Sequence, residues 1–324
     1  MKQETTHHAA ASDATRWREL PWLTAKGFCM GAADVVPGVS GGTMALILGI
    51  YVRLIDAVKS VDSKVLQAGL RGRWRLVLNR VHWRFLAMLL SGVFAAIIFF
   101  TRIVRLPALM NSHPEAVYGL FFGLILGSVW FVYRDSGITR SIDGLWIVLG
   151  AAVGLRIVTL APGDTPDHPL FVFLTGAVAI TAMILPGISG SFILLIMRKY
   201  EYIFSQFARL GNGFQETIAA LLILLPFFLG MVAGIIVFSR LLSWFLHHHR
   251  VRTYLVLTGF MLGSLWVIWP WQERTFELVR EKQRLTASHP VLPEFAASTF
   301  WWGLGMMIVG GTVVIILEML GRKR

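Results

Sequence analysis

Long apolar runs separated by short polar segments dominate the chain. Six runs approach the length of a membrane span, and they cover residues 85–100, 117–133, 145–160, 218–238, 254–269 and 300–317. Crossing a hydrocarbon core of about 30 Å takes about 20 residues of helix. Backbone groups inside the core have no water to bond, and the runs lack the alternation of barrel strands, so we expect helices.

The pattern occurs twice along the chain. Residues 37–41 read Pro-Gly-Val-Ser-Gly and residues 186–190 read Pro-Gly-Ile-Ser-Gly. Later positions match in the same order: Tyr118, Gly123, Gly127, Ser128 and Trp130 with Tyr254, Gly259, Gly263, Ser264 and Trp266, and Gly92 and Arg102 with Gly230 and Arg240. Matches in a fixed order indicate a duplication. We predict a polar cytoplasmic tail over 1–19, a first repeat over 20–161 and a second over 162–324.

Each repeat is predicted to begin with a helical hairpin broken at its Pro-Gly, because proline removes a donor and glycine frees φ. The helical pieces are expected over about 20–36 and 40–58, and over about 169–185 and 189–207. Three spans follow in each repeat, over about 83–105, 117–134 and 143–161, and over about 218–245, 252–270 and 300–320. Whether the hairpin is re-entrant or fully spanning, it returns the chain to its starting side. The predicted fold is an all-α polytopic membrane protein of two inverted-topology repeats, as in many secondary transporters.

Basic residues lie between the apolar runs. The chain has 30 Lys and Arg against 18 Asp and Glu, but only 15% of its residues are charged and 56% are hydrophobic. With the N-terminus inside, Lys and Arg concentrate in the cytoplasmic segments 59–84, 134–140, 250–252 and 322–324, whereas 106–116 and 162–169 contain none. This distribution favours contact with membrane lipids over nucleic acid, and it predicts that both termini are cytoplasmic.

The segment 271–299 is expected to be an extracytoplasmic loop that has no counterpart in the first repeat. Glu273, Glu277, Arg280, Glu281 and Arg284 have helical spacing. This spacing predicts an amphipathic helix on the membrane surface.

The two Pro-Gly-x-Ser-Gly motifs are the strongest candidates for a binding site. After the break a helix is expected to begin at Ser40-Gly41-Gly42-Thr43 in one motif and at Ser189-Gly190-Ser191 in the other. A helix N-terminus presents unpaired N–H groups, glycine lets a phosphate approach the backbone, and hydroxyl groups add donors. Two such termini would converge near the midplane and hold an anion, with the halves rocking around it. The alternative is that each serine only caps its own helix.

Charged residues near the motifs are further candidates. Asp34 lies in an apolar stretch, where it would either bind a proton or cation for coupling or hydrogen-bond the neighbouring turn. The matched residue in the second repeat is Met183. Arg53 and Arg198 follow the two motifs, and they would either hold phosphate in a bidentate manner or extend toward the headgroups.

The sequence contains no pattern typical of catalysis or metal binding. There is no Ser/His/Asp triad, Walker loop or zinc spacing. The adjacent His247, His248 and His249 would point in different directions on a helix. We therefore expect no enzyme activity, no catalytic residue, no metal ligand and no cofactor.

The motifs resemble those of the bacterial polyprenyl-phosphate transporter family. The resemblance rests on GAADVVPGVSGGT over residues 31–43 and LPGISGS over residues 185–191, and it extends over nearly the whole chain. It implies an inner-membrane protein that returns undecaprenyl phosphate from the outer to the inner leaflet for the synthesis of envelope polymers such as peptidoglycan. The headgroup site that it implies consists of Asp34, Gly38, Ser40, Gly41, Gly42, Thr43, Gly187, Ser189, Gly190 and Ser191.

Two other functions are consistent with this chemistry. Undecaprenyl-pyrophosphate phosphatases also have inverted repeats and a Pro-Gly-x-Ser motif, but an Arg follows their Ser where this chain has Gly41 and Gly190. The chain also lacks an intramembrane Glu cluster, and phosphoryl transfer needs positive charge on the transferred group. A transporter of a small soluble anion is the second alternative. The sequence leaves the driving force, the chain-length preference and the oligomeric state open.

Overall fold

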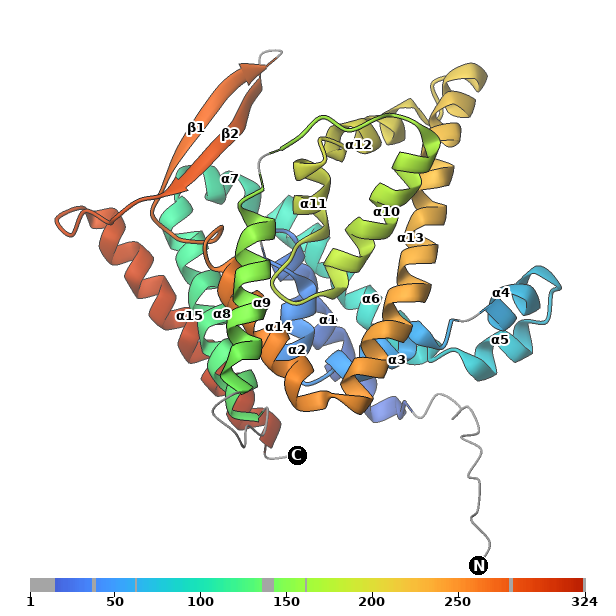
Figure 1. Ribbon diagram of the computed structural model, residues 1–324, viewed down its shortest axis with the longest axis horizontal. Helices are drawn as coiled ribbons and strands as arrows, with labels where there is room; N and C mark the ends of the chain where they lie inside the picture. Colours follow the sequence, from blue (N-terminus) through green and yellow to red (C-terminus); the bar gives the residue numbers. More distant parts are fainter. Residues whose placement is uncertain are drawn as a thin grey trace, which may run out of the picture.

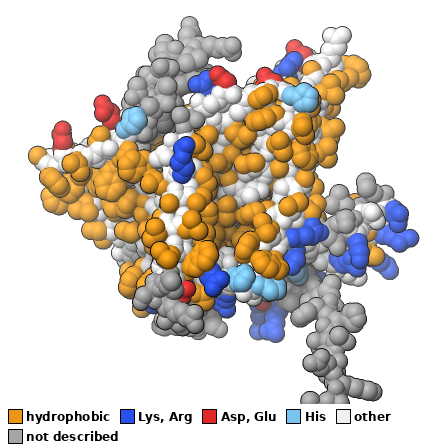
Figure 2. Space-filling view, in the orientation of Figure 1, with side chains coloured by type: hydrophobic (Ala, Val, Ile, Leu, Met, Phe, Trp, Pro, Cys, Tyr) orange, Lys and Arg blue, Asp and Glu red, His pale blue; other side chains and the backbone are white. Residues whose placement is uncertain are grey.

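The computed structural model describes residues 15–36, 39–61, 63–135, 143–160, 162–279 and 282–322. Most of these residues are helical (Figure 1). The beginning of α1 (Leu20–Asp34) and the end of α15 (Ser298–Arg322) lie at the lower edge of Figure 1. Hydrophobic side chains cover the middle of the face in Figure 2, whereas Lys, Arg and His gather toward its lower edge.

The first half consists of helices on both sides of the first motif. A short turn, η1 (Trp17–Glu19), precedes α1. After the motif the chain forms α2 (Gly41–Ile47), α3 (Tyr51–Lys59), α4 (Ser63–Leu70), α5 (Trp74–Arg80) and α6 (Trp83–Ile98). A π-helical turn, η2 (Phe99–Ile103), extends α6, and α7 (Leu106–Ser112), α8 (Pro114–Asp135) and α9 (Gly144–Val158) follow.

The second half has the same order of long elements. It contains α10 (Pro169–Ile184), α11 (Gly190–Ile196), α12 (Tyr200–Arg209), α13 (Phe214–His248) and α14 (Arg250–Ser264). Two strands, β1 (Gln272–Val279) and β2 (Lys282–Pro290), precede α15.

Length and composition identify this chain as a multi-pass membrane protein. Among the described residues, four helical stretches are long and apolar enough to cross a bilayer: Trp83–Ile103, Pro114–Arg134, Phe214–His248 and Ser298–Leu317. The pair α2 and α3 passes the same test as one span bent by 120°, and α9 and α10 are shorter apolar helices. The predicted all-helical membrane class is confirmed apart from the hairpin of strands.

Each broken hairpin has three helical pieces and not the predicted two. The single helix expected over 40–58 ends at Ile47, because Gly49 adopts a left-handed φ of 68° and Lys26 Nζ donates to Leu48 O at 2.7 Å. The helix expected over 189–207 breaks in the same way at Arg198, whose φ is 50°. The additional break in the first hairpin has a glycine, Gly49, to signal it. The additional break in the second hairpin requires Arg198 to adopt a left-handed conformation that is unusual for arginine.

The prediction of an amphipathic helix in 271–299 was wrong. Strands β1 and β2 form an antiparallel hairpin, with an irregularity in register between Thr275 and Phe276. Residues four apart, such as Glu273 and Glu277, share a face on a strand as well as on a helix. Their spacing therefore could not distinguish a helix from a strand. The β-branched and aromatic residues of β1 favour the strand. Arg280 and Glu281 lie outside the described residues.

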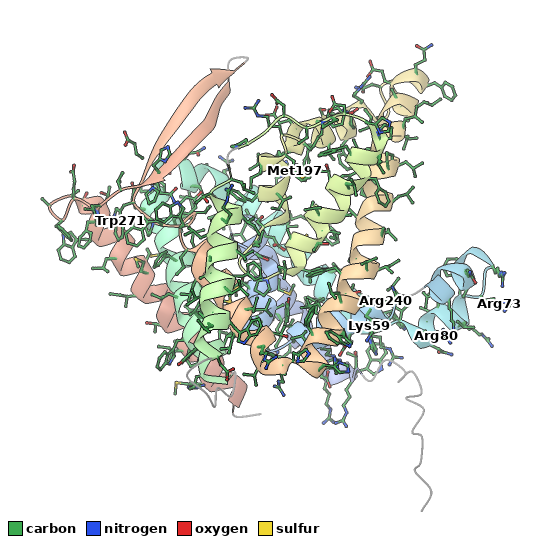
Figure 3. The ribbon with its side chains drawn as sticks, in the orientation of Figure 1. Lys59, Arg73, Arg80, Met197, Arg240 and Trp271 are labelled. Carbon is green, nitrogen blue, oxygen red and sulfur yellow. The ribbon has the colours of Figure 1, made fainter. Side chains whose placement is uncertain are left out.

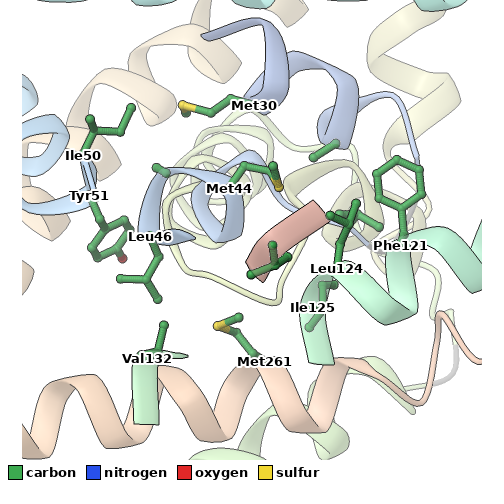
Figure 4. Packing of buried hydrophobic residues seen from close by; sticks show 14 of the residues in the cluster. Met30, Met44, Leu46, Ile50, Tyr51, Phe121, Leu124, Ile125, Val132 and Met261 are labelled. Carbon is green, nitrogen blue, oxygen red and sulfur yellow. The ribbon is translucent and has the colours of Figure 1, made fainter. Parts of the chain in front are cut away.

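The main hydrophobic core surrounds the short helix α2. Met44 and Leu46 of α2 are buried with Phe121 and Ile125 of α8 and with Met261 of α14 (Figure 4). Residues from both halves therefore enclose the helix that follows the first motif. This packing places the motif inside the body of the protein.

The first span of each half packs on its hairpin through matched close contacts. Helix α1 packs on α6, and α10 packs on α13. A Cβ atom at Gly92 would overlap the carbonyl oxygen of Thr24, and one at Gly230 would overlap that of Phe173. Glycine at these positions lets two helix backbones approach closely.

The last spans exchange partners between the halves. Helix α9 packs on α14, and α15 packs on α8. The α9–α14 contact resembles the α15–α8 contact, because each brings a glycine against a backbone carbonyl. A Cβ at Gly150 of α9 would overlap Val256 O of α14, and one at Gly310 of α15 would overlap Leu120 O of α8. Helices α8, α9, α14 and α15 thus form a four-helix group to which both halves contribute. Gly119, Gly123 and Gly127 of α8 and Gly259 and Gly263 of α14 all lie in these interfaces, and their spacing of four residues is typical of close helix packing.

We expect Gly92→Ala and Gly230→Ala to lower the stability of the protein to a similar degree. Each added methyl group must displace a neighbouring backbone, and overpacking of this kind costs about 1–3 kcal/mol. The unfolding temperature of the purified chain in detergent measures the effect. Gly305→Ala on α15 is the control, because its Cβ would have no neighbour within 4 Å. An unchanged unfolding temperature for Gly92→Ala and Gly230→Ala would contradict the matched packing.

Candidate functional site

The first motif is closed by its own side chains. Ser40 caps α2, and its Oγ accepts a hydrogen bond from Gly42 N at 3.1 Å. Asp34 Oδ1 accepts from Gly41 N at 2.7 Å. Two N–H groups at the start of α2 are therefore satisfied within the protein. Pro37 and Gly38 lie outside the described residues.

Hydrogen bonds join the first motif to the second half. Gly187 N donates to Thr43 Oγ1 at 2.9 Å, and Tyr51 OH donates to Ile184 O at 3.2 Å. The Ser40 hydroxyl lies 3.3 Å from both Met183 O and Leu185 O. The bonds from Tyr51 and Ser40 satisfy backbone carbonyl groups at the end of α10 that have no partner within the helix. We call this contact between the two motifs the motif junction.

Backbone segments approach one another closely at the motif junction, and glycine makes this possible. A Cβ at Gly42 would lie 2.6 Å from Ile184 O. Gly187 adopts a φ of 87°, and its Cβ would lie 2.8 Å from Phe260 O. Side chains are excluded at both positions. Gly42 thus allows direct contact with the second half, and Gly187 allows contact with α14 of its own half.

The second motif lacks the side-chain hydrogen bonds that satisfy the N–H groups of the first motif. Ser189 precedes α11 but makes no side-chain capping bond, and its Oγ lies 2.8 Å from Ser191 Oγ. Within the described part of the chain, the N–H groups of Gly190 and Ser191 have no hydrogen-bond partner. Met183 occupies the position that matches Asp34. The second motif therefore has donors without a carboxylate of its own.

The structure brings Asp34, Ser40, Gly41, Gly42 and Thr43 together with Gly187, but it places Arg53 elsewhere. Arg53 binds Glu19 Oε2 at 3.0 Å and Thr15 Oγ1 at 2.8 Å, and its guanidinium lies over the Phe85 ring. Glu19 and Asp34 are at opposite ends of α1, which is about 22 Å long at 1.5 Å per residue.

Arg198 also lies away from the motif junction. Its Nη1 binds Asp164 Oδ1 at 2.8 Å, and its side chain is exposed. The next residue, Lys199, is buried and bonds to Asp167 and Thr165 O. Both basic residues therefore bind the loop before α10.

Sequence analysis missed a polar network between α3 and α13. Ser243 Oγ donates to Asp56 Oδ1 at 3.1 Å and accepts from Lys59 Nζ at 3.1 Å. His247 Nδ1 lies 2.7 Å from Ser243 O. Lys59 lies beside the lower end of α13 (Figure 3). Asp56 and Lys59 are three residues apart and so share a helix face, but their partner on α13 could not be inferred from sequence.

The α3–α13 contact has no comparable counterpart between α12 and α6 in the part of the chain that the structure describes. Helix α12, which corresponds to α3, packs on α13 and makes no comparable contact with α6 in the described chain. No group of three or more His, Cys, Asp or Glu side chains is placed to hold a metal among the described residues.

Sequence comparisons connect this geometry to known proteins. A family model described as undecaprenyl phosphate translocase-like matches residues 30–285. The chain belongs to this family. The matched region contains both motifs and the α3–α13 network.

Two curated relatives agree with the family. A polyprenyl-phosphate transporter of Vibrio cholerae is 41% identical over 252 residues, which are 76% of this chain and 77% of the relative. A polyprenyl-phosphate transporter of Staphylococcus aureus is 31% identical over 266 residues, which are 78% of this chain and 88% of the relative. No solved structure matches the chain.

We expect Ser40→Ala to destabilise the protein more than Ser189→Ala. The first substitution removes a helix cap worth about 1 kcal/mol together with bonds to the second half. The second removes only a contact with Ser191, so we expect a loss below about 1 kcal/mol. Unfolding temperatures of the purified variants would measure the difference, with the exposed Ser91→Ala as the control. Equal losses at Ser40 and Ser189 would show that the two motifs are not organised differently.

Proposed function

We propose that this protein carries undecaprenyl phosphate across the bacterial inner membrane, from the outer to the inner leaflet, for reuse in the synthesis of envelope polymers. The motif junction is the observation that carries the proposal. It brings hydrogen-bonding groups of both halves together inside an apolar body. The printed names of the two relatives support the substrate class.

The headgroup phosphate binds at the second motif. Its donors are the N–H groups of Gly190 and Ser191 and whichever hydroxyl of Ser189 and Ser191 does not donate to the other. At the first motif the Asp34 carboxylate already accepts the equivalent N–H bond. Protonation of Asp34 would remove a negative charge from the vicinity of the phosphate and so couple proton binding to lipid binding. The prenyl tail stays in the lipid along the apolar outer faces.

The two halves are inverted repeats. The matched contacts of Gly92 with Thr24 and of Gly230 with Phe173 support this architecture. The beginning of α1 lies at the lower edge of Figure 1 and the beginning of α10 at the upper edge, which also supports it. The gathering of Lys and Arg at the lower edge favours a cytoplasmic location for that edge and for both termini.

The exchange of partners among the last spans changes the mechanism predicted from the sequence. Helices α8, α9, α14 and α15 hold parts of both halves together, so the halves do not rock as whole bodies. The moving units are α1–α3 with α6 and α10–α12 with α13. The contact of α3 with α13 closes the cytoplasmic end. Among the described residues α12 makes no comparable contact with α6, which leaves the opposite end more open. Release of the lipid into the inner leaflet requires α3 to separate from α13.

The packing around the motifs disfavours the phosphatase alternative. An arginine in place of Gly41 would put its Cβ 2.5 Å from Asp34 Oδ2. At Gly190 the Cβ would lie 2.6 Å from Ala179 O. The chain therefore has no room for the cation that phosphoryl transfer needs at these positions.

A transport assay tests the proposal. Purified protein is reconstituted into sealed vesicles with labelled undecaprenyl phosphate in one leaflet, and exchange between the leaflets is followed. We expect Ser40→Leu/Ser189→Leu to abolish exchange because bulky apolar groups replace the hydroxyls, while Ser91→Leu retains it. The expression level and elution volume of each variant establish that it is folded.

Parallel vesicles separate the alternatives. Free phosphate released from the pyrophosphate form of the lipid would indicate a phosphatase, and uptake of a labelled soluble anion without lipid exchange would indicate a small-anion transporter. Full lipid exchange in the double variant would exclude the motifs as the headgroup site.

A cross-linking experiment tests the closure between α3 and α13. In a Cys29→Ala background, Asp56→Cys and Ser243→Cys are joined by a short reducible cross-linker. We expect lipid exchange to stop and to return on reduction, because the two residues belong to different moving units. Thr24→Cys with Met88→Cys is the matched control, since these side chains touch within one unit. Undiminished exchange in the cross-linked Asp56/Ser243 pair would rule out this closure.

A further inference from the structure

Helices α4 and α5 form a hairpin that projects from the helical body (Figure 1). The two helices pack on each other, and in the described chain neither packs to a comparable extent on another element. The hairpin connects α3 to α6 and lies toward the lower edge, where Lys and Arg gather (Figure 2). Neither the motif junction nor the α3–α13 network involves it.

The sequence of the hairpin region is strongly basic. Residues 63–84 contain no Asp or Glu. They contain six cationic residues: Lys64, Arg71, Arg73, Arg75, Arg80 and Arg84. The hairpin region therefore carries a strongly positive net charge.

The basic side chains converge on a cavity between the two helices. One face of α4 and the turn after it contributes Lys64, Gln67, Ala68 and Arg71, and one face of α5 and the turn before it contributes Arg73, Leu76 and Arg80. Arg73 and Arg80 are labelled on the hairpin in Figure 3. The cavity measures about 160 Å³. A water molecule takes up about 30 Å³, so there is room for a group the size of a phosphate.

The other face of α5 is apolar and exposed. Trp74 and Leu78 are four residues apart and so share a face, and they are 64% and 47% exposed. At the base of the hairpin, Trp83 is exposed and the Arg84 guanidinium lies over the rings of Trp17 and Trp83. A helix with cations on one face and Trp and Leu on the other is typical of segments that lie in the membrane interface.

We propose that the α4–α5 hairpin lies in the headgroup layer of the cytoplasmic leaflet and binds the phosphate of an anionic glycerophospholipid in this cavity. Trp74 and Leu78 enter the acyl boundary beside the bound lipid. Charge complementarity selects an anionic headgroup, and the exposed apolar face selects a lipid over a soluble anion. This site is separate from the path proposed for the transported lipid.

A fluorophore on the apolar face tests the proposal in the full-length protein. The label is attached to Leu78→Cys in a Cys29→Ala background, and the protein is reconstituted with phosphatidylcholine alone or with phosphatidylglycerol added. We expect phosphatidylglycerol to shield the label from quenching by aqueous iodide, and about 1 M salt to reverse the shielding because charges are then screened beyond ~3 Å.

Two matched triple variants identify the groups responsible. Arg71→Gln/Arg73→Gln/Arg80→Gln removes three cavity cations, and we expect it to weaken the response to phosphatidylglycerol on the order of 100-fold. Arg102→Gln/Arg105→Gln/Arg209→Gln removes the same net charge elsewhere, and we expect it to retain the response. A retained response in the first variant would overturn the proposal, and so would equal losses in the two variants.

The lipid composition series distinguishes the remaining occupants. Equal quenching with and without phosphatidylglycerol would show that the hairpin does not bind anionic lipid. Loss of the shielding on addition of inorganic phosphate alone, at an ionic strength matched with chloride, would identify a soluble phosphate site and overturn the lipid assignment.

Discussion

A helix that breaks inside an apolar body leaves backbone N–H and C=O groups without partners, and no water is there to bond them. This protein breaks a helix at each motif and satisfies many of the freed groups across the boundary between its halves. Thr43 receives the N–H of Gly187, and Ser40 and Tyr51 donate to carbonyls at the end of α10. The position of α2 follows from this requirement, as does the packing of α8 and α14 around it. The same breaks supply the donors at Gly190 and Ser191 that a bound anion can use.

The hydrophobic pattern predicted four of the six expected spans, because a membrane requires long apolar helices whatever their neighbours are. Of the other two, α9 is a shorter apolar helix, and α14 ends at Ser264, before the expected end at 270. The pattern did not predict the second break in each hairpin, since Gly49 is a weak signal and Arg198 gives none. The β-hairpin was missed because its charges have a spacing common to helices and strands. The motifs drew attention to Ser40, Thr43 and Gly187, which the structure places at the contact between the two motifs. They did not predict that the N–H groups of the first motif are satisfied while those of the second are not. That difference depends on Asp34, which accepts a hydrogen bond from Gly41, seven residues later. The partners of Arg53, Lys59 and Ser243 come from distant segments, and a single sequence contains no information on those contacts.

The packing of α9 on α14 and of α15 on α8 affects how the protein can move. In a simple pair of repeats each half would be a rigid body with its own core. Here α9 and α15 each pack on a helix of the opposite half, and the glycines at these contacts leave no gap for sliding. In the proposed mechanism the mobile units are therefore the two broken hairpins, each with the span that packs on it, α6 or α13. The polar network of Asp56, Lys59 and Ser243 lies between these two mobile units.

The exchange of partners also has a consequence for synthesis in the cell. Helix α8 is made long before α15, yet the contacts of its glycines in the described chain are with that helix. A nascent chain that has inserted only its first half therefore exposes an unfilled helix-packing surface to lipid. That surface remains until the 25 residues of α15 enter the membrane. Completion of the core thus depends on α15, and a truncation before Ser298 would leave α8 without its partner even though both motifs had already been made.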